Sequence, residues 1–328
     1  MKKAVKKTKG RKGKQDRPDI PPLERLRRDL RAAAEKLSDA EVRYLVDLYY
    51  QMQSVRIGTG NQISSMSKHD EPVAVIGWAN DNMRTIEDEI KTALDIYTDN
   101  DPTGMGSWAK AHHGIGPCIA AGLLAHIDIS KVKTVGGIWR FAGLDPMSKW
   151  EPHTKRPWNA ALKTLCFKLG ESFVKFQDKS GYGKLFVKRK AEEWARKLKG
   201  EFSEQAKARS AQVGKGTQAY KWYAGKLSPG IVRNLLDQGL TEKLYMIGAT
   251  NVGDEAPMLP PAHIHARARR WTVKIFLYFW FAEAYYRQWH REPPLPYVID
   301  QLKHTDLIWP ENMSFVPEGF TVTWKGPM

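Results

Sequence analysis

The chain has 328 residues, enough to bury a sizeable core in one or two domains. Its 52 Lys and Arg outnumber 36 Asp and Glu, which gives a formal net charge of +16. Its two cysteines exclude a disulfide framework and a zinc site, and no apolar run is long enough to cross a bilayer. The composition favours a polyanionic partner, most simply a nucleic acid, and no membrane partner. We therefore expect a cytoplasmic protein that is associated with DNA or the nucleoid.

The positive charge is concentrated at the start and in the last two thirds of the chain. Residues 1–17 carry +8, residues 18–105 carry −6 and residues 106–328 carry +14. We expect residues 1–22 to form a disordered basic tail, because they hold almost no apolar side chains. This tail is either a phosphate-binding arm or a solubilising segment, and its candidate contacts are Lys2, Lys3, Lys6, Lys7, Arg11 and Lys12.

Residues 23–104 are predicted to form a helical N-terminal region. Ser38 to Glu41 has the pattern of a capping box, which opens a helix that we expect to end at Gly58–Asn61, before a polar loop. The next helix, at about 72–97, carries an apolar stripe typical of a helix–helix seam, through which copies of the chain could also associate. A shorter helix is expected to precede both, from near Leu23 to Ala33.

The stretch Gly114-Ile115-Gly116-Pro117 has the pattern of the turn in a helix-hairpin-helix. Two glycines allow a tight turn, and proline is favoured in the first turn of the helix that follows. Backbone amides at the start of that helix can bind a phosphate, so the pattern predicts non-specific binding to a nucleic-acid backbone. The alternatives are a turn between core helices without a ligand, or a turn that holds a metal cation; no other cofactor is evident.

Basic and aromatic residues are interleaved from Lys149 to Lys226, a stretch that contains 19 basic and seven acidic residues. Such interleaving suits phosphate contact combined with base stacking, whereas the alternative is an aromatic core under a solvated basic face. Helices are expected at 158–177 and 182–208. The candidate nucleic-acid contacts here are Lys149, Lys155, Arg156 and Lys163.

The last third of the chain is predicted to contain the central helix of the domain. We expect this helix at 263–291, apolar nearly all round in its middle and basic at its start, where Arg267, Arg269 and Arg270 are candidate contacts. It is expected to be preceded by a connector at 214–229, a short helix through Leu240 and a loop, and to be followed by a Pro-rich arm at 292–328 with a strand-like piece at 320–324.

These patterns predict a mainly α fold. Its centre is a helix-hairpin-helix DNA-binding domain at 105–291, which contains a basic insertion at about 180–260. The helical region 23–104 precedes this domain, and the irregular C-terminal arm follows it.

Three motifs of this domain resemble those of a known family. Gly114-Ile115-Gly116-Pro117, then Phe141-Ala142-Gly143-Leu144 with Pro146, then Trp158-Asn159 with Leu162-Lys163 are similar to the C-terminal domain of the bridge-RNA-guided insertion-sequence transposases. The match covers roughly residues 105–175 and 262–290. The family also carries an N-terminal RuvC-like nuclease domain, and residues 1–104 lack the strand and carboxylate pattern of that domain.

The resemblance implies a nucleophilic serine after the Gly-Leu-x-Pro turn. Ser148 is the nearby serine, and a catalytic serine would need a base such as His153 or Lys149. The sequence leaves three functions open. The first is a non-catalytic DNA-binding protein of mobile-element or phage type, which the sequence favours. The others are a serine-dependent transposase or recombinase, and an RNA-binding structural component of a nucleoprotein.

Overall fold

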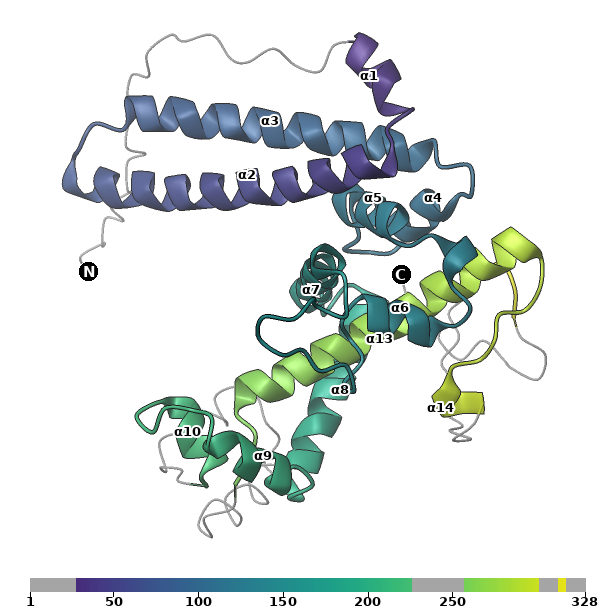
Figure 1. The fold of residues 1–328 in the computed structure, drawn as a ribbon. Coiled ribbons are helices and arrows are strands. Elements are labelled where there is room, and N and C mark those ends of the chain that lie inside the picture. Colours follow the sequence, from purple (N-terminus) through teal and green to yellow (C-terminus); the bar gives the residue numbers. More distant parts are fainter. Residues whose placement is uncertain (1–27, 226–256, 301–311, 317–328) are drawn as a thin grey trace, which may run out of the picture. The chain divides into compact units, whose positions relative to one another are not determined.

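The computed structural model describes residues 28–225, 257–300 and 312–316, and within these ranges the protein is helical, without a strand (Figure 1). This confirms the mainly α fold. The chain divides into two units, residues 1–100 and 101–328, each considered by itself below. The basic tail, the helix predicted before Leu240 and the strand-like piece at 320–324 lie outside the described residues.

The first unit is built on two long helices that lie side by side in an antiparallel pair (Figure 1). The Ser38 hydroxyl accepts from the Glu41 amide at 3.3 Å, and the Glu41 carboxylate accepts from the Ser38 amide at 2.9 Å, which confirms the capping box. The elements are α1 (Arg28–Ala34), α2 (Asp39–Met66), the 3-10 turn η1 (Ser67–His69) and α3 (Ala74–Asp99).

The predicted end of the second helix at Gly58–Asn61 is wrong, because α2 continues unbroken to Met66. Each helical glycine costs only about 1 kcal/mol relative to alanine. Packing on α3 outweighs that cost, and it includes a partly buried contact from Arg56 Nε to Glu87 Oε2 at 2.5 Å. The helix predicted at 72–97 is α3, and association of copies through it stays a prediction.

The second unit surrounds α13 (Pro261–Trp289), whose middle is buried on all sides. Phe276, Phe279, Trp280 and Phe281 are at most 2% exposed, which confirms the predicted central helix. Helices α7 and α8 pack along it (Figure 1). The other helices are α4 (Met105–Lys110), α5 (Pro117–His126), α6 (Val135–Phe141), α7 (Ala160–Lys175), α8 (Gly181–Leu198), α9 (Ser203–Ser210), α10 (Gln218–Tyr223) and α14 (Tyr297–Asp300), with the 3-10 turn η2 (Ile129–Lys131).

Two predicted boundaries in this unit are wrong. The helix expected at 182–208 is broken at Gly200, whose φ of +80° is the left-handed conformation that glycine adopts readily. The connector expected at 214–229 contains α10, which Thr217 caps by accepting from the Tyr220 amide. The helix forms because Trp222 and Tyr223 bury their rings in a cluster with Trp194, Phe202, Met258 and Ile264.

Candidate nucleic-acid interface

The Gly114–Gly116 turn joins α4 to α5, as the sequence predicted. Gly114 has a φ of +95°, and its carbonyl oxygen accepts a hydrogen bond from the Ser172 hydroxyl on α7. Ile115 is buried beneath the turn, whereas Gly116 is exposed and is the N-cap residue of α5. No side-chain cap is found at this helix start, Pro117 has no N–H, and the Ile119 amide donates to the Gly116 carbonyl at 3.1 Å, so what the start offers an anion is mainly its positive dipole end.

Helix α5 runs antiparallel to α7. The turn at its start contacts Ser172, and His126 at its end lies 3.5 Å from the side chain of Asn159, the N-cap of α7. Between them a Cβ on Gly122 would lie 2.7 Å from Leu165, so glycine permits the close packing. Asn159 and Ser172 are about 20 Å apart along α7, at 1.5 Å per residue. The turn and the start of α7 therefore lie at opposite ends of the α5–α7 pair.

The Ala-Gly-Leu turn after α6 positions the beginning of α7. Gly143 has a φ of +64°, and a Cβ there would lie 2.9 Å from both Trp158 Cγ and Lys163 Cδ. The Asn159 amide donates to the Phe141 carbonyl at 2.9 Å, and the Asn159 side chain accepts from the Leu162 amide. The second and third motifs of the sequence are thus in direct contact.

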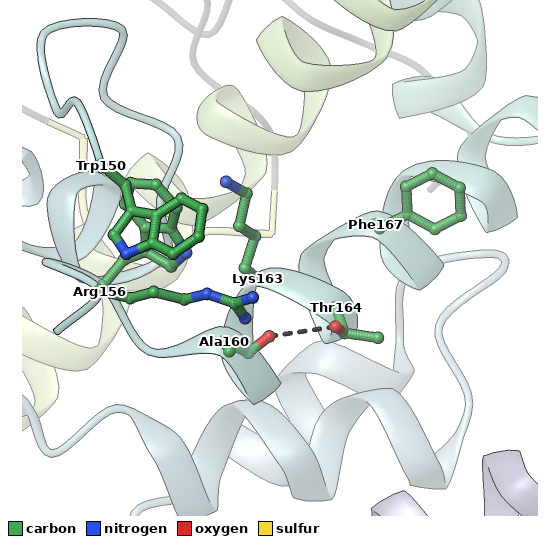
Figure 2. Close-up of a pocket in the computed structure, with 7 residues that line it drawn as sticks. Trp150, Arg156, Ala160, Lys163, Thr164 and Phe167 are labelled. Carbon is green, nitrogen blue, oxygen red and sulfur yellow. Dashed lines mark hydrogen bonds between the residues drawn. The ribbon is translucent and has the colours of Figure 1, made fainter. Parts of the chain in front are cut away.

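A cavity of about 420 Å³ opens beside this contact. It is lined by three aromatic rings and two cations, with no carboxylate among the described lining residues (Figure 2). Figure 2 shows the Arg156 side chain extended beside the Trp150 indole, with Phe167 farther along α7. The lining residues are Trp150, Trp158, Phe167, Arg156, Lys163, Ala160 and Thr164.

Each of the two tryptophans in this pocket is paired with a cation. The Arg156 guanidinium carbon lies 5.3 Å from the centroid of the Trp150 ring, and Lys163 Nζ lies 3.9 Å from that of Trp158. These distances lie within the range of cation–π attraction. The indole N–H of Trp150 donates to the Thr154 carbonyl at 2.8 Å, which fixes the ring in its loop.

Lys163 in this pocket lies within electrostatic reach of two other cations, Arg156 from the loop and Arg270 from α13. The pKa of Lys163 is lowered, first by its removal from water and then by the charges of Arg270 and Arg156. The pKa of Arg270 on α13 is also lowered, by burial and by the neighbouring Arg267. The fold thus brings three of the predicted contacts, Arg156, Lys163 and Arg270, within electrostatic reach of one another.

The other predicted contacts on α13 are already held by carboxylates. Arg267 Nε lies 2.7 Å from the buried carboxylate of Glu193, and Arg269 forms an ion pair with Glu171. The guanidinium of Arg269 also lies 4.0 Å from the ring centroid of Phe167, at the edge of the pocket. Lys149 and Lys155 are exposed in the loop that carries Trp150.

The interleaved aromatics between 149 and 226 divide into two groups. Trp150 is exposed, whereas Trp194 and Trp222 belong to the core. Between these two buried indoles lies Lys197, with its Nζ 3.9 Å and 3.7 Å from the ring centroids. Burial lowers the pKa of Lys197 well below its usual value. This lysine was not predicted, although the three-residue spacing of Trp194 and Lys197 places both on one helix face.

Ser148 lies in the turn after Pro146 and is half-buried. Its hydroxyl donates to Asp145 at 3.5 Å, and neither Lys149 nor His153 is its hydrogen-bond partner among the described contacts. The same carboxylate accepts from the Met147 amide at 2.9 Å and lies 3.5 Å from Arg140. Asp145 is therefore the side chain that orients Ser148.

Both cysteines, Cys118 and Cys166, are buried thiols. Among the described ranges there is no group of three or more His, Cys, Asp or Glu side chains that could hold a metal ion, and none of the helices could span a membrane. No protein-family model, curated protein or solved structure matches this chain.

Proposed function

We propose that this protein binds nucleic acid, and DNA in particular, through phosphate contacts on the basic face around the pocket. The observation that carries the proposal is the position of Arg156 and Lys163 in a pocket with no carboxylate among its described lining residues, with the charge of Arg270 also acting on Lys163. Holding like charges together costs free energy, and a phosphate bound between them offsets that cost. Binding to DNA would also associate the protein with the nucleoid.

The Gly114–Gly116 turn is the second phosphate position in this proposal. Its helix α5 has ten residues and an N-cap glycine without a side-chain cap, so its positive dipole end favours an anion. The turn and the start of α7 are about 20 Å apart along α7, so they would be two separate phosphate positions. Assignment of this turn as a helix-hairpin-helix belongs to the proposal.

The test is the salt dependence of binding by the full chain. We expect the affinity for duplex DNA to fall as salt rises, with a log–log slope of about −0.9 for each phosphate contact. Lys163→Ala and Arg270→Ala should each reduce the slope by about one contact. Lys91→Ala is the control, because Lys91 is an exposed lysine on α3 in the acidic stretch 18–105. A slope of zero, or an equal effect of the Lys91 variant, would reject the proposal.

RNA is the competing partner in the same experiment. A-form RNA presents the same phosphate charge, so the basic face alone does not select DNA. Matched DNA and RNA duplexes compete for the protein in one titration. A protein that prefers RNA by tenfold or more would be a nucleoprotein component rather than a DNA-binding protein.

Strand transfer by Ser148 is the second candidate function. The hydrogen bond from the Ser148 hydroxyl to Asp145 favours it, because a carboxylate in that position can accept a proton from an attacking serine. Denaturing gels of reactions with nicked, branched and intact DNA would reveal a covalent protein–DNA adduct. The adduct should disappear in Ser148→Ala and persist in Ser130→Ala, and its absence with every substrate would exclude this chemistry.

A further inference from the structure

Three aromatic rings line the pocket, and phosphate binding uses none of them. Trp150 is 41% exposed and Phe167 is 49% exposed, although both are large apolar side chains. Elsewhere in this unit, Trp194, Trp222 and Trp280 are at most 5% exposed. Exposed aromatic area of this size on a basic surface is available for a ligand to cover.

The cations of the pocket lie against the aromatic faces. Arg156 is paired with Trp150, Lys163 with Trp158 and Arg269 with Phe167. A phosphate attracts a guanidinium or an ammonium more strongly than a ring does, because it carries a full charge. A phosphate bound beside the pocket would therefore draw Arg156 and Lys163 toward itself and leave the indole faces open.

The two indoles are held in place before any ligand binds. The Trp150 N–H donates to the Thr154 carbonyl, and Trp158 packs against Gly143, where a Cβ would lie 2.9 Å from its ring. Rings that are already ordered lose little conformational entropy on binding. The cavity of about 420 Å³ falls within the size range of ligand pockets.

We propose that this pocket stacks an unpaired nucleobase, so that the preferred substrate is a single-stranded segment rather than an intact duplex. The inference rests on the proposed function and names its substrate class. In a duplex both faces of each base are covered by neighbours, and exposing one costs a few kcal/mol. An unpaired base offers its face to Trp150 at no such cost, while the adjoining phosphates meet Arg156 and Lys163.

The experiment compares three forms of one oligonucleotide at constant salt with the full chain. They are the single strand, the same strand in a duplex, and the same strand with abasic residues in place of its bases. The abasic strand keeps every phosphate and removes every stacking face. We expect the single strand to bind roughly 5- to 100-fold more tightly than the abasic strand, which is the range that stacking of one base supplies.

Variants locate the effect at the pocket. Trp150→Ala should lower binding of the single strand to near the abasic level and reduce duplex binding much less, whereas Trp150→Phe should retain most of the preference. The control is Trp78→Ala, which removes a tryptophan that is 37% exposed on α3. Because the described contacts of Trp150 are only with its own loop and with Arg156, thermal unfolding should show that Trp150→Ala is still folded at the temperature of the binding experiment.

The outcomes separate the two proposals. Equal affinity for the single strand and the abasic strand, with strong salt dependence, would overturn base stacking and leave phosphate binding intact. An equal loss in Trp78→Ala would also overturn it. No binding of any strand would instead reject the proposed function itself. DNA and RNA versions of the three oligonucleotides show which sugar the pocket accepts.

Discussion

His112 Nε2 accepts a hydrogen bond from the side-chain amide of Asn312 at 2.7 Å, across 200 residues of sequence. The other ring nitrogen, Nδ1, lies 2.9 Å from the Trp108 carbonyl, so a neutral ring with its proton on Nδ1 satisfies both contacts. The Trp108 indole donates in turn to the Asn312 carbonyl at 3.1 Å. These bonds attach residues 312–316 to α4, the helix that precedes the Gly114–Gly116 turn.

The histidine of this pair should make stability depend on pH. Burial lowers the pKa of His112 to about 4, from an ordinary value of 6.5. The unfolded chain therefore takes up a proton first as the pH falls, so the contribution of His112 is present above pH 6.5 and is lost toward pH 4. We expect the free energy of unfolding to fall by about 2 kcal/mol between pH 7 and pH 5 through this group.

Urea unfolding at the two pH values measures this loss. His112→Gln should lose less stability than the wild type over the same interval, because glutamine does not titrate. The exposed His153 provides the control, and His153→Gln should follow the wild type. Parallel pH dependence in the wild type and His112→Gln would contradict the assignment.

Gly143 should be required for the pocket, because it combines a φ of +64° with the absence of a Cβ. Gly143→Ala places a methyl group against Trp158 and Lys163 in an unfavourable backbone conformation, and we expect a loss of about 1–3 kcal/mol. Gly137→Ala is the matched control in the preceding helix, since a Cβ there meets no atom within 4 Å. It should stabilise the protein by about 0.5–1 kcal/mol. Thermal unfolding would distinguish them, and similar shifts in both variants would contradict this packing.

Arg267 should serve stability more than nucleic-acid binding. Its partner Glu193 is 1% exposed and also lies 2.6 Å from Arg189, so the carboxylate depends on its arginines for compensation. Removing one of them leaves part of a buried charge unpaired, and we expect Arg267→Ala to cost about 1–3 kcal/mol, since Arg189 and solvent at the arginines limit the loss. The log–log slope of DNA affinity against salt for Arg267→Ala should stay closer to the wild-type slope than the slope for Arg270→Ala does. A stable Arg267→Ala with a strongly reduced slope would reverse these roles.

Gly58 tests the continuity of α2. A Cβ at this position meets no atom within 4 Å, and the residue lies in the interior of the helix. Gly58→Ala should therefore raise the free energy of unfolding by about 0.5–1 kcal/mol, and thermal melting followed by the helical circular dichroism signal would measure this gain. If residues 58–61 formed a loop instead, the same substitution would leave the melting temperature unchanged or lower it.

Local sequence patterns were sufficient wherever neighbouring residues decide the structure. The capping box at Ser38 and Glu41 involves contacts within a few residues, so its spacing identifies it. The buried middle of α13 follows from apolar side chains on all sides of one helix. The end of α2 at Gly58–Asn61 was mispredicted because packing between helices outweighs a small local preference.

The sequence by itself determined the mainly α fold, the basic character of the chain and the turn at Gly114–Gly116. Only the tertiary structure decided which cations and aromatics form the pocket. Trp150 and Trp194 both stand among basic residues, yet packing exposes one and buries the other. Arg267 and Arg270 are three residues apart on α13, yet the first meets Glu193 from α8 whereas the second joins Lys163 from α7. The reason is physical: burial and charge pairing depend on segments that are distant along the chain and adjacent in space.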